Sequence, residues 1–204
     1  MVIDNWLPAV MAVIGYLIGS IPFGVVVTRC LGTVDPRTAG SRNIGFTNVL
    51  RVSGKKAGVL TLTGDLGKGW MVAWLAAQIV DQQAWVLVIA MSPILGHLYP
   101  IFLGFHGGKG VATALGAVTG IVPVIGALIL LIWIVAVAVW RYSSGGAIAA
   151  FVLFPVIALG MGTDWLFQLF SVLVSGLILL RHKENLVRLW RGTEPKIGQR
   201  SAAV

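Results

Sequence analysis

The stretch "VATALGAVTGIVPVIGALILLIWIVAVAVW", residues 111–140, decides the fold. It carries no charged residue over its whole length. A bilayer span needs about 20 mostly apolar residues, so the stretch can cross a membrane twice if it turns near "GIVP" (Gly120–Pro123), with a short first crossing. Lys109 and Arg141 flank it, and basic residues mark the cytoplasmic side. Two crossings are therefore favoured, and a single tilted helix over Val111–Trp140 is the alternative.

The rest of the chain has the same character. Of its 204 residues, 57% are hydrophobic and 11% are charged, and the mean hydropathy is +0.92. The other apolar stretches are Trp6–Val27, Gly69–Val80, Trp85–Phe105, Ala147–Gly162 and Trp165–Leu180. This pattern predicts an all-α integral membrane protein with one domain over residues 1–204, of which 197–204 form a flexible tail.

The charge distribution predicts the orientation. All 15 Lys and Arg residues lie in Arg29–Lys68, at Lys109, at Arg141 or in Arg181–Arg200. Asp4, Asp81 and Asp164 mark the ends between these basic regions. Because cytoplasmic loops carry the Lys and Arg excess, we expect seven transmembrane helices, with the N-terminus outside and the C-terminus in the cytoplasm. Five or six crossings remain the alternative count.

The first basic segment, Asp35–Gly58, is interpreted as a cytoplasmic loop that binds phosphate. Glycine N–H groups form anion-binding nests, and hydroxyl, amide and guanidinium groups donate directed hydrogen bonds. An ordinary turn-rich loop beside lipid headgroups is the alternative, but the density of donors favours phosphate binding. The candidate ligands are Gly40, Ser41, Asn43, Thr47, Asn48 and Arg51.

The segment "GFHGGKGVAT" (Gly104–Thr113) has the chemistry of a phosphate-binding loop but not the spacing of a nucleotide P-loop. One residue too few separates its first glycine from the Gly-Lys pair, and a glycine follows the lysine where the P-loop has Ser or Thr. Glycines let the backbone approach a ligand, and a following helix N-terminus favours an anion. A flexible turn explains the glycines but not the lysine. The predicted phosphate ligands are Gly107, Gly108, Lys109 and Gly110.

Two later cytoplasmic segments carry polar candidates. "RYSSGGA" (Arg141–Ala147) places Ser144 between two helices, where a serine either caps a helix or donates to a substrate, and both interpretations stay open. "RHKENLVRLWRGTEPKI" (Arg181–Ile197) is predicted to be a basic amphipathic segment on the membrane surface. His182 and Asn185 lie near its membrane edge.

Three polar residues inside predicted spans are second-rank candidates. Asp65 and Lys68 share a helix face, where they can form an ion pair. Ionisable residues in spans are functional candidates by default, but a structural pair is an equal alternative. His97, in "GHLYP", precedes the glycine-rich segment, and a lone His in an apolar helix is more often structural than catalytic.

These segments favour an enzyme that handles a phosphorylated substrate at the cytoplasmic face. A phosphate or organophosphate transporter is the alternative, but it needs polar residues in both membrane halves and the outer halves are almost purely apolar. A lipid-binding scaffold, which would tolerate loss of Lys109, is a third possibility. The net charge of +8 is explained by orientation and by anionic lipid headgroups, so no nucleic-acid partner is expected.

Several motifs resemble one family. They are "GSIPFG" (19–24), "DPRTAGSRNIGFTNVLR" (35–51), "GHLYPIFLGFHGGKGVATALG" (96–116), "RYSS" (141–144) and "RHKENLVRLWRGTEPKI" (181–197). In this order they are similar to the bacterial glycerol-3-phosphate acyltransferases of the PlsY type, over nearly the whole chain. Arg42, Phe46 and His106 stand where the family usually has Gly, Ala and Lys.

The resemblance implies a seven-helix enzyme of the bacterial inner membrane, with its active site at the cytoplasmic face. It would transfer an acyl chain from acyl phosphate to the 1-hydroxyl of glycerol-3-phosphate, giving lysophosphatidic acid and phosphate, the first step of phospholipid synthesis. Its partners would be both substrates, membrane lipid and the enzyme that produces acyl phosphate. The implied catalytic residues are Ser41, Arg51, Lys109, Ser144, His182 and Asn185.

The expected mechanism uses neither cofactor nor metal. No histidine has an Asp five positions later, so the His-Asp arrangement of other glycerolipid acyltransferases is absent, and no cluster has metal-ligand spacing. Acyl phosphate is already activated, so positioning and charge stabilisation suffice. We expect the donor's phosphate oxygen to take the hydroxyl proton; His182 as general base is the rival hypothesis.

Overall fold

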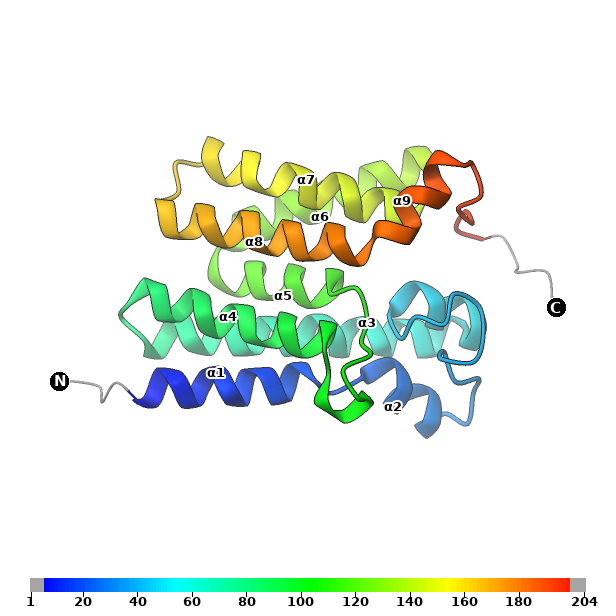
Figure 1. Cartoon of the computed structure of the whole chain (residues 1–204), viewed down its shortest axis with the longest axis horizontal. Helices are drawn as coiled ribbons and strands as arrows, with labels where there is room; N and C mark the ends of the chain where they lie inside the picture. The colour runs from blue at the N-terminus through cyan, green and yellow to red at the C-terminus, as the bar shows by residue number, and fades with distance from the viewer. Residues whose placement is uncertain (1–5, 199–204) are drawn as a thin grey trace. The chain divides into compact units, whose positions relative to one another are not determined.

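The computed structural model describes residues 6–198, and the regular elements throughout this range are helices (Figure 1). No strand occurs in residues 6–198, which confirms the predicted all-α class. The chain divides into two compact units, Met1–Pro123 and Val124–Val204.

The first unit contains most of the polar segments predicted to bind phosphate. Its described elements are α1 (Trp6–Gly19), α2 (Phe23–Cys30), α3 (Phe46–Ile79), α4 (Gln83–Leu98), the 3-10 helix η1 (Ile101–Leu103) and α5 (Val111–Ile121). The predicted span Trp6–Val27 is therefore two helices, which are bent by 45° across the break that precedes α2. Pro22 lies in this break and has no N–H to continue a helical ladder.

Small residues let the helices of the first unit pack backbone to backbone. A Cβ atom added to Gly19 would collide with Pro93 of α4, and one added to Gly96 would collide with the carbonyl of Tyr16 on α1. On the other side, a Cβ on Gly116 of α5 would collide with the Leu66 carbonyl on α3. In a membrane, where lipid tails are as apolar as leucine, such close van der Waals packing is a main source of helix association.

The long helix α3 corrects the predicted boundaries of the first cytoplasmic loop. The loop was expected to continue to Gly58, but helix begins at Phe46. A break inside α3 falls at Gly54, whose φ of 87° and ψ of 177° lie outside the helical region. Thr47, Asn48 and Arg51 are therefore held on a short helical segment rather than on a flexible loop.

The second unit is a set of apolar helices closed by a polar segment. Its helices are α6 (Pro123–Trp140), which begins at the boundary residue, α7 (Ser143–Gly160), α8 (Trp165–Arg181) and α9 (Lys183–Trp190). Asp164 caps α8 by accepting hydrogen bonds from the backbone N–H groups of Leu166 and Phe167, at 2.9 and 3.1 Å. The rings of Phe154 and Phe167 join α7 to α8 in an edge-to-face contact, with centroids 6.1 Å apart.

A helix break is present within the predicted turn segment Gly120–Pro123. Helix α5 ends at Ile121 and α6 begins at Pro123, and Val122 between them has φ −130° and ψ 86°. Proline is well tolerated in the first turn of a helix because its missing N–H would have no partner there. The single tilted helix over residues 111–140 is therefore not formed.

Helix length and composition indicate which elements could cross a membrane. Within the described residues, three helical stretches are long and apolar enough to span: Gln83–Leu103, Pro123–Trp140 and Ser143–Gly160. The number rises to five if each of two bent pairs, α1 with α2 and α8 with α9, is one span. The apolar α5 is shorter than a span.

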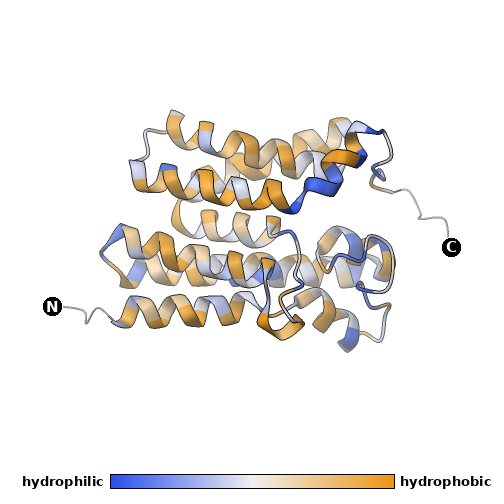
Figure 2. Ribbon diagram, in the orientation of Figure 1, coloured by the Kyte–Doolittle hydropathy of each residue, from blue (hydrophilic) through white to orange (hydrophobic). Residues whose placement is uncertain are grey.

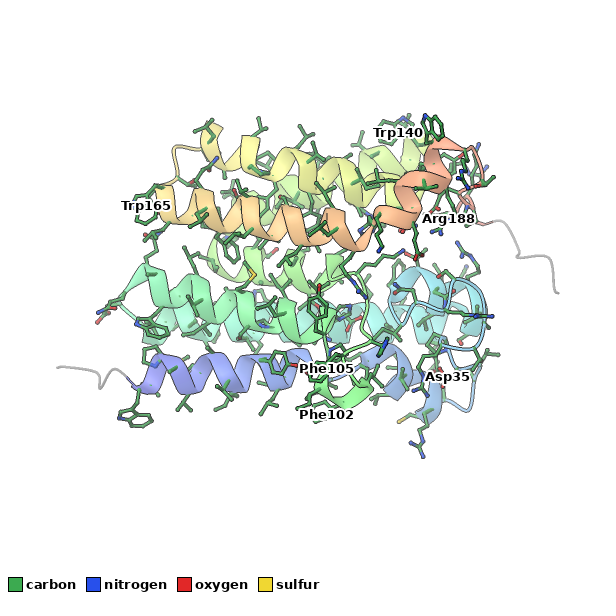
Figure 3. All side chains as sticks on the ribbon, in the orientation of Figure 1. Asp35, Phe102, Phe105, Trp140, Trp165 and Arg188 are labelled. Carbon is green, nitrogen blue, oxygen red and sulfur yellow. The ribbon has the colours of Figure 1, made fainter. Side chains whose placement is uncertain are left out.

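Exposed side chains match this assignment. Figure 2 shows apolar residues along the helices of each unit, and hydrophilic residues on the segment after α2 and on α9. Leu159 and Leu180 are 68% and 70% exposed, as expected for lipid-facing positions. Trp140 and Trp165 lie at opposite ends of the second unit (Figure 3), where the 18 residues of α7 span about 27 Å. Tryptophans at both ends of spans are typical of the two membrane interfaces.

Candidate active site

Asn48 organises the segment that carries Ser41. Its side chain is 2% exposed, and its amide nitrogen lies 2.9, 3.1 and 2.9 Å from the carbonyls of Pro36, Ala39 and Asn43. Its amide oxygen accepts from the backbone N–H of Ser41 at 2.9 Å. Asn48 therefore holds the backbone of the loop, and it influences a bound phosphate through the position that it gives to Ser41.

Two left-handed residues present Ser41 to the outside. Gly40 and Arg42 have φ values of 62° and 56°, and Ser41 between them is exposed. The turn after them is fixed by Asn43, whose side-chain oxygen accepts from the N–H of Gly45 at 2.8 Å. Arg42 thus occupies a backbone conformation that favours glycine, which gives a physical reason for the glycine that the family usually has here.

We expect Arg42→Gly to be tolerated. A left-handed conformation costs a non-glycine residue about 1–2 kcal/mol, and removing this cost roughly offsets the larger unfolded-state entropy of glycine, about 0.4–1 kcal/mol. The melting temperature in detergent should therefore stay close to that of the wild type, with turnover unchanged. Lys56→Gly, at an exposed helical position of α3, is the matched control and should lose about 1 kcal/mol. An equal loss of stability in Arg42→Gly and Lys56→Gly would show that the Arg42 side chain itself stabilises the loop.

The first turns of α3 place two more predicted ligands on one face. Thr47 and Arg51 are separated by one helical turn and are both half-buried. Residues at this spacing are neighbours on a helix surface. A hydroxyl donor and a guanidinium fork on one face suit the oxygens of a phosphate group.

The glycine-rich segment before α5 is shaped by close packing on α4. The N–H of Gly108 donates to the carbonyl of His97 at 3.1 Å. A Cβ atom added to Gly107 would collide with that same carbonyl, and one added to Gly108 would collide with Nε2 of His97. The sequence therefore needs glycine at both positions for steric reasons, in addition to any ligand.

Lys109 and Gly110 lead directly into α5. Lys109 is half-buried, and Gly110 occupies the N-cap position with φ 82° and no side-chain capping hydrogen bond. The first N–H groups of a helix have no intrahelical partners, so this uncapped N-terminus favours an anion. His106, where the family commonly has Lys, is exposed and its Nδ1 lies 2.7 Å from the carbonyl of Gly104.

An apolar turn precedes the glycines. Phe102 and Phe105 project from the segment around η1 (Figure 3) and are 59% and 57% exposed. Phe105 and Gly104 both adopt positive φ values, 65° and 56°. Exposed aromatic side chains next to a polar segment are typical of a membrane–water interface.

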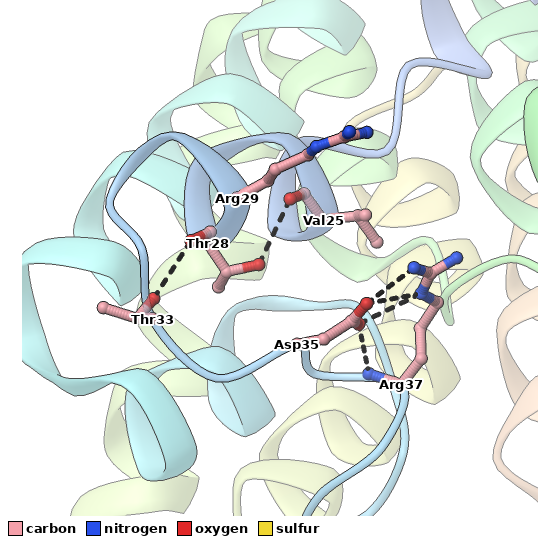
Figure 4. Close-up of a pocket in the computed structure, with 6 residues that line it drawn as sticks. All are labelled: Val25, Thr28, Arg29, Thr33, Asp35 and Arg37. Atoms are coloured by element: carbon pink, nitrogen blue, oxygen red, sulfur yellow. Dashed lines mark hydrogen bonds and ion pairs between the residues drawn. The ribbon is translucent and has the colours of Figure 1, made fainter.

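A small pocket near the end of α2 holds an ion pair (Figure 4). Arg37 donates to both carboxylate oxygens of Asp35, with a shortest distance of 2.6 Å. These hydrogen bonds hold the pKa of Asp35 below its ordinary value of 3.8. Exposed pairs of this kind contribute little to stability, so we assign this pair the local role of shaping the turn after α2.

In the second unit, a carboxylate absent from the predicted set joins three polar side chains. Oε1 of Glu194 accepts from Oγ of Ser144 at 2.6 Å and from Nδ2 of Asn185 at 2.6 Å. Oε2 accepts from Nε of Arg188 at 2.7 Å. The side chain of Glu194 is only 7% exposed. Glu194 therefore brings together the predicted residues Ser144 and Asn185, which come from α7 and α9.

The environment of Glu194 keeps it ionised. Burial alone would raise the pKa of its carboxyl, but hydrogen bonds from Ser144, Arg188 and Asn185 outweigh burial and lower the pKa below its ordinary 4.5. A carboxylate that accepts several donors is stabilised in its charged form. At neutral pH, Glu194 can thus fix the direction of the hydroxyl and amide groups that it binds.

Ser144 does not cap α7, which was one of the two roles open to it from the sequence. Tyr142 occupies the N-cap position of α7 and makes no side-chain capping hydrogen bond. Ser144 lies one residue inside the helix, is buried, and directs its hydroxyl to Glu194.

His182 lies at the end of α8 and is 3% exposed. Its Nδ1 lies 2.8 Å from the carbonyl of Ile178. A carbonyl can only accept, so Nδ1 carries a hydrogen, and any proton-accepting role belongs to Nε2. After His182 the chain bends by 62° into α9. Leu186, Val187 and Trp190 on α9 are exposed by 42%, 46% and 88%, as expected for a helix that lies on a membrane surface.

The ion pair predicted from the i, i+3 spacing is present. Nζ of Lys68 lies 2.9 Å from Oδ1 of Asp65, and both side chains are buried. Among residues 6–198, no group of three His, Cys, Asp or Glu side chains could hold a metal ion.

The fold and these clusters define a class of protein. It is an all-helical integral membrane protein with two groups of polar side chains, one in each unit, that consist mainly of hydrogen-bond donors and cations. The chain matches the family profile described as glycerol-3-phosphate acyltransferase over residues 9–192. The chain belongs to this family.

Individual relatives agree over nearly the whole chain. It is 44% identical to the glycerol-3-phosphate acyltransferase of Bordetella pertussis, covering 93% of this chain and 92% of that one. The Paraburkholderia xenovorans relative is 43% identical, with 95% and 92% covered. A crystal structure of PlsY, an integral membrane glycerol 3-phosphate acyltransferase, in its glycerol 3-phosphate form is similar with a TM-score of 0.90 at 36% identity, covering 94% of this chain and 96% of that one.

Proposed function

We propose that this protein transfers an acyl chain from acyl phosphate to the 1-hydroxyl of glycerol-3-phosphate. The proposal gains support from family membership and from the similar PlsY structures, which are described in a glycerol 3-phosphate form and a lysophosphatidic acid form. The acyl-phosphate donor comes from the motif resemblance in the sequence.

One observation carries the proposal most directly. Lys109 is half-buried between glycines at the uncapped N-terminus of α5. A full charge, a helix N-terminus and a backbone without side chains combine the features that bind phosphate groups. A scaffold that only held lipid would have no need of this combination.

The reaction needs no covalent enzyme intermediate. The 1-hydroxyl oxygen attacks the acyl carbonyl carbon, and the bond from that carbon to the phosphate oxygen breaks. The hydroxyl proton goes to a phosphate oxygen of the departing group, so the products are lysophosphatidic acid and inorganic phosphate. The protein's contribution is to align the two substrates and to stabilise the developing negative charge.

The roles divide between the two units. In the first, Ser41, Arg51 and Lys109 would bind phosphate oxygens, helped by the backbone N–H groups of the glycine-rich segment. In the second, Asn185 would donate its second amide hydrogen to a substrate, while Ser144, whose one hydroxyl hydrogen goes to Glu194, could accept a hydrogen bond there. His182 would contribute through Nε2, as a donor to a phosphate when protonated or as the rival general base when neutral.

The same proposal includes a location. We infer seven crossings of a bacterial inner membrane, with the N-terminus outside and the C-terminus and active site at the cytoplasmic face. The basic residues gather in four regions, and the ends between them are acidic or, between Lys109 and Arg141, without charge. Acyl phosphate is a reactive anhydride, so the enzyme that produces it would act as a functional partner.

The test is phosphate release by the purified protein in detergent. We expect release from palmitoyl phosphate only when glycerol-3-phosphate is also present, with lysophosphatidic acid formed in equal amount. Palmitoyl-CoA should give no product, because its acyl carbon is bonded to a thiol sulfur and not to the phosphate group that the site is proposed to hold.

Two outcomes would contradict different parts of the proposal. Product from palmitoyl-CoA but not from palmitoyl phosphate would overturn the donor and leave the acceptor in place. No product from either donor, in a preparation that stays monodisperse and melts cooperatively, would overturn the acyltransferase function itself.

A further inference from the structure

A buried ionic cluster lies directly beneath the glycine-rich segment. Asp65, Lys68 and His97 are 2%, 4% and 4% exposed. Oδ1 of Asp65 lies 2.9 Å from Nζ of Lys68 and 3.3 Å from Nδ1 of His97. Burying charges costs free energy that their attraction often fails to recover, and apolar side chains of similar size usually stabilise a core at least as well. The cluster therefore calls for an explanation other than stability alone.

One edge of the cluster supports the glycine-rich segment. The carbonyl of His97 accepts from the N–H of Gly108 at 3.1 Å, and Nε2 of the same residue occupies the space that a side chain on Gly108 would need. The imidazole thus stands between the Asp65 carboxylate, at Nδ1, and the backbone one residue before Lys109. A rotation of the ring would move the surface on which this backbone rests.

The other edge anchors the break between α1 and α2. Nζ of Lys68 donates to the carbonyl of Ile21 at 2.8 Å and lies 5.6 Å from the centre of the Phe23 ring. In the helix break, the Ile21 carbonyl accepts from the backbone N–H of Phe23 at 3.1 Å, and the ammonium group adds a second, charged hydrogen bond to it. Through Asp65, this break, α3, α4 and the glycine-rich segment are joined in one polar network.

We propose that Asp65, Lys68 and His97 are positioning residues that hold residues 107–110 in their phosphate-binding conformation. The proposal rests on the function proposed above for that segment. Asp65 orients the imidazole, the imidazole supports the backbone of Gly108, and Lys68 neutralises Asp65 while fixing the cluster to α1 and α2. The three residues act on a ligand through the segment that they support.

The experiment uses substitutions that test the contacts of the two imidazole nitrogens separately. In His97→Asn, the amide nitrogen can replace Nδ1 toward Asp65, but nothing replaces Nε2 beneath Gly108. In His97→Gln, the longer side chain reaches the Nε2 position instead. Asp65→Asn keeps the shape of the carboxyl and removes its charge.

The readout is affinity for phosphate ligands, measured directly with labelled glycerol-3-phosphate and by competition with inorganic phosphate. A displaced binding segment costs about tenfold to a hundredfold in the step that depends on it. We expect His97→Asn and Asp65→Asn to weaken the binding of at least one of these ligands about tenfold. His97→Gln should lose less affinity than His97→Asn. In turnover, the KM for a phosphate substrate should rise more than kcat falls.

A matched control isolates positioning from stability. Ser92 lies on α4, is buried, and donates to the carbonyl of Ile89 at 2.7 Å. Ser92→Ala removes a buried hydrogen bond from the same helix without touching residues 107–110. It should lower the melting temperature and leave both affinities unchanged.

A double-mutant cycle adds a test whose result cannot be produced by a general loss of stability. Gly108→Ala and His97→Asn disrupt the same contact, so their combined effect on affinity should be smaller than the sum of the two. Gly67→Ala, at a position with open space around it, should have no effect on affinity.

The results distinguish this inference from the proposed function. Wild-type affinities in His97→Asn and Asp65→Asn, with melting temperatures lowered as in Ser92→Ala, would overturn the positioning role. A wild-type protein that binds both phosphate ligands but transfers no acyl group would overturn the proposed function, and the affinities would still decide the positioning role.

Discussion

Lys109→Ala is expected to lower kcat/KM for glycerol-3-phosphate acylation about a thousandfold, the upper range for loss of one donor to a developing negative charge. The lysine is half-buried at an uncapped helix N-terminus, where its charge is less screened than at an open surface. Steady-state rates of phosphate release at varied concentrations of each substrate measure the effect. The melting temperature should change little.

Two variants serve as controls for the charge. Lys55→Ala removes an exposed lysine from α3 and should leave kcat/KM near the wild-type value. Lys109→Arg keeps the charge but replaces a compact ammonium by a planar fork, so we expect an intermediate rate. If Lys109→Ala retains more than a tenth of the wild-type rate, the glycine-rich segment does not have the role proposed for it.

The sequence predicted the features that depend on local composition. The break at Val122 was expected because Gly120 and Pro123 interrupt a run without charges, and the ion pair of Asp65 and Lys68 was expected from helix periodicity. Both are present. Features of this kind depend on neighbours within a few residues, which a single sequence displays.

The start of α3 could not be predicted in this way. Residues 46–53 were expected in the loop because they contain several polar residues, yet they form helix. The buried Asn48 also satisfies the backbone of the preceding turn. That contact joins Asn48 to carbonyls as far away as Pro36. A single sequence does not display hydrogen bonds between residues this far apart.

Glu194 was missed for a related reason. Its neighbours in sequence suggest only an exposed basic tail, and its partner Ser144 is 50 residues away. A signal was available: Glu194 is the last acidic residue of the chain and follows two arginines, Arg188 and Arg191. An isolated acidic residue is expected to pair with a nearby cation, which predicts the contact with Arg188 but not the contact with Ser144.

Glu194→Gln is expected to lower both activity and stability. An amide can accept hydrogen bonds at one of its two ends only, so either Arg188 or the pair of Ser144 and Asn185 meets an opposing donor. Loss of charged hydrogen bonds at a buried site costs about 1.5–3 kcal/mol each, which predicts a clear drop in melting temperature. Because Ser144 and Asn185 lose a fixed direction, acyl transfer should fall about tenfold to a hundredfold.

The stability difference should depend on pH in one direction. The folded-state pKa of Glu194 lies below its ordinary 4.5, so its contribution is present in full above the unfolded-state pKa. It is lost as pH falls through the lower folded-state pKa. The gap in melting temperature between wild type and Glu194→Gln should therefore be constant from neutral pH to about 5.5 and shrink below about 4.5.

The control for Glu194→Gln is a second glutamate beside the same arginine. Glu184 lies 3.9 Å from Arg188 with its side chain 79% exposed, and exposed pairs contribute about 0–1 kcal/mol. Glu184→Gln should therefore leave activity, melting temperature and pH dependence close to those of the wild type. Equal effects of the two substitutions would mean that net charge near Arg188, rather than the buried hydrogen bonds to Ser144 and Asn185, supports the site. A large loss confined to Glu194→Gln would assign the ordering of Ser144 and Asn185 to one carboxylate.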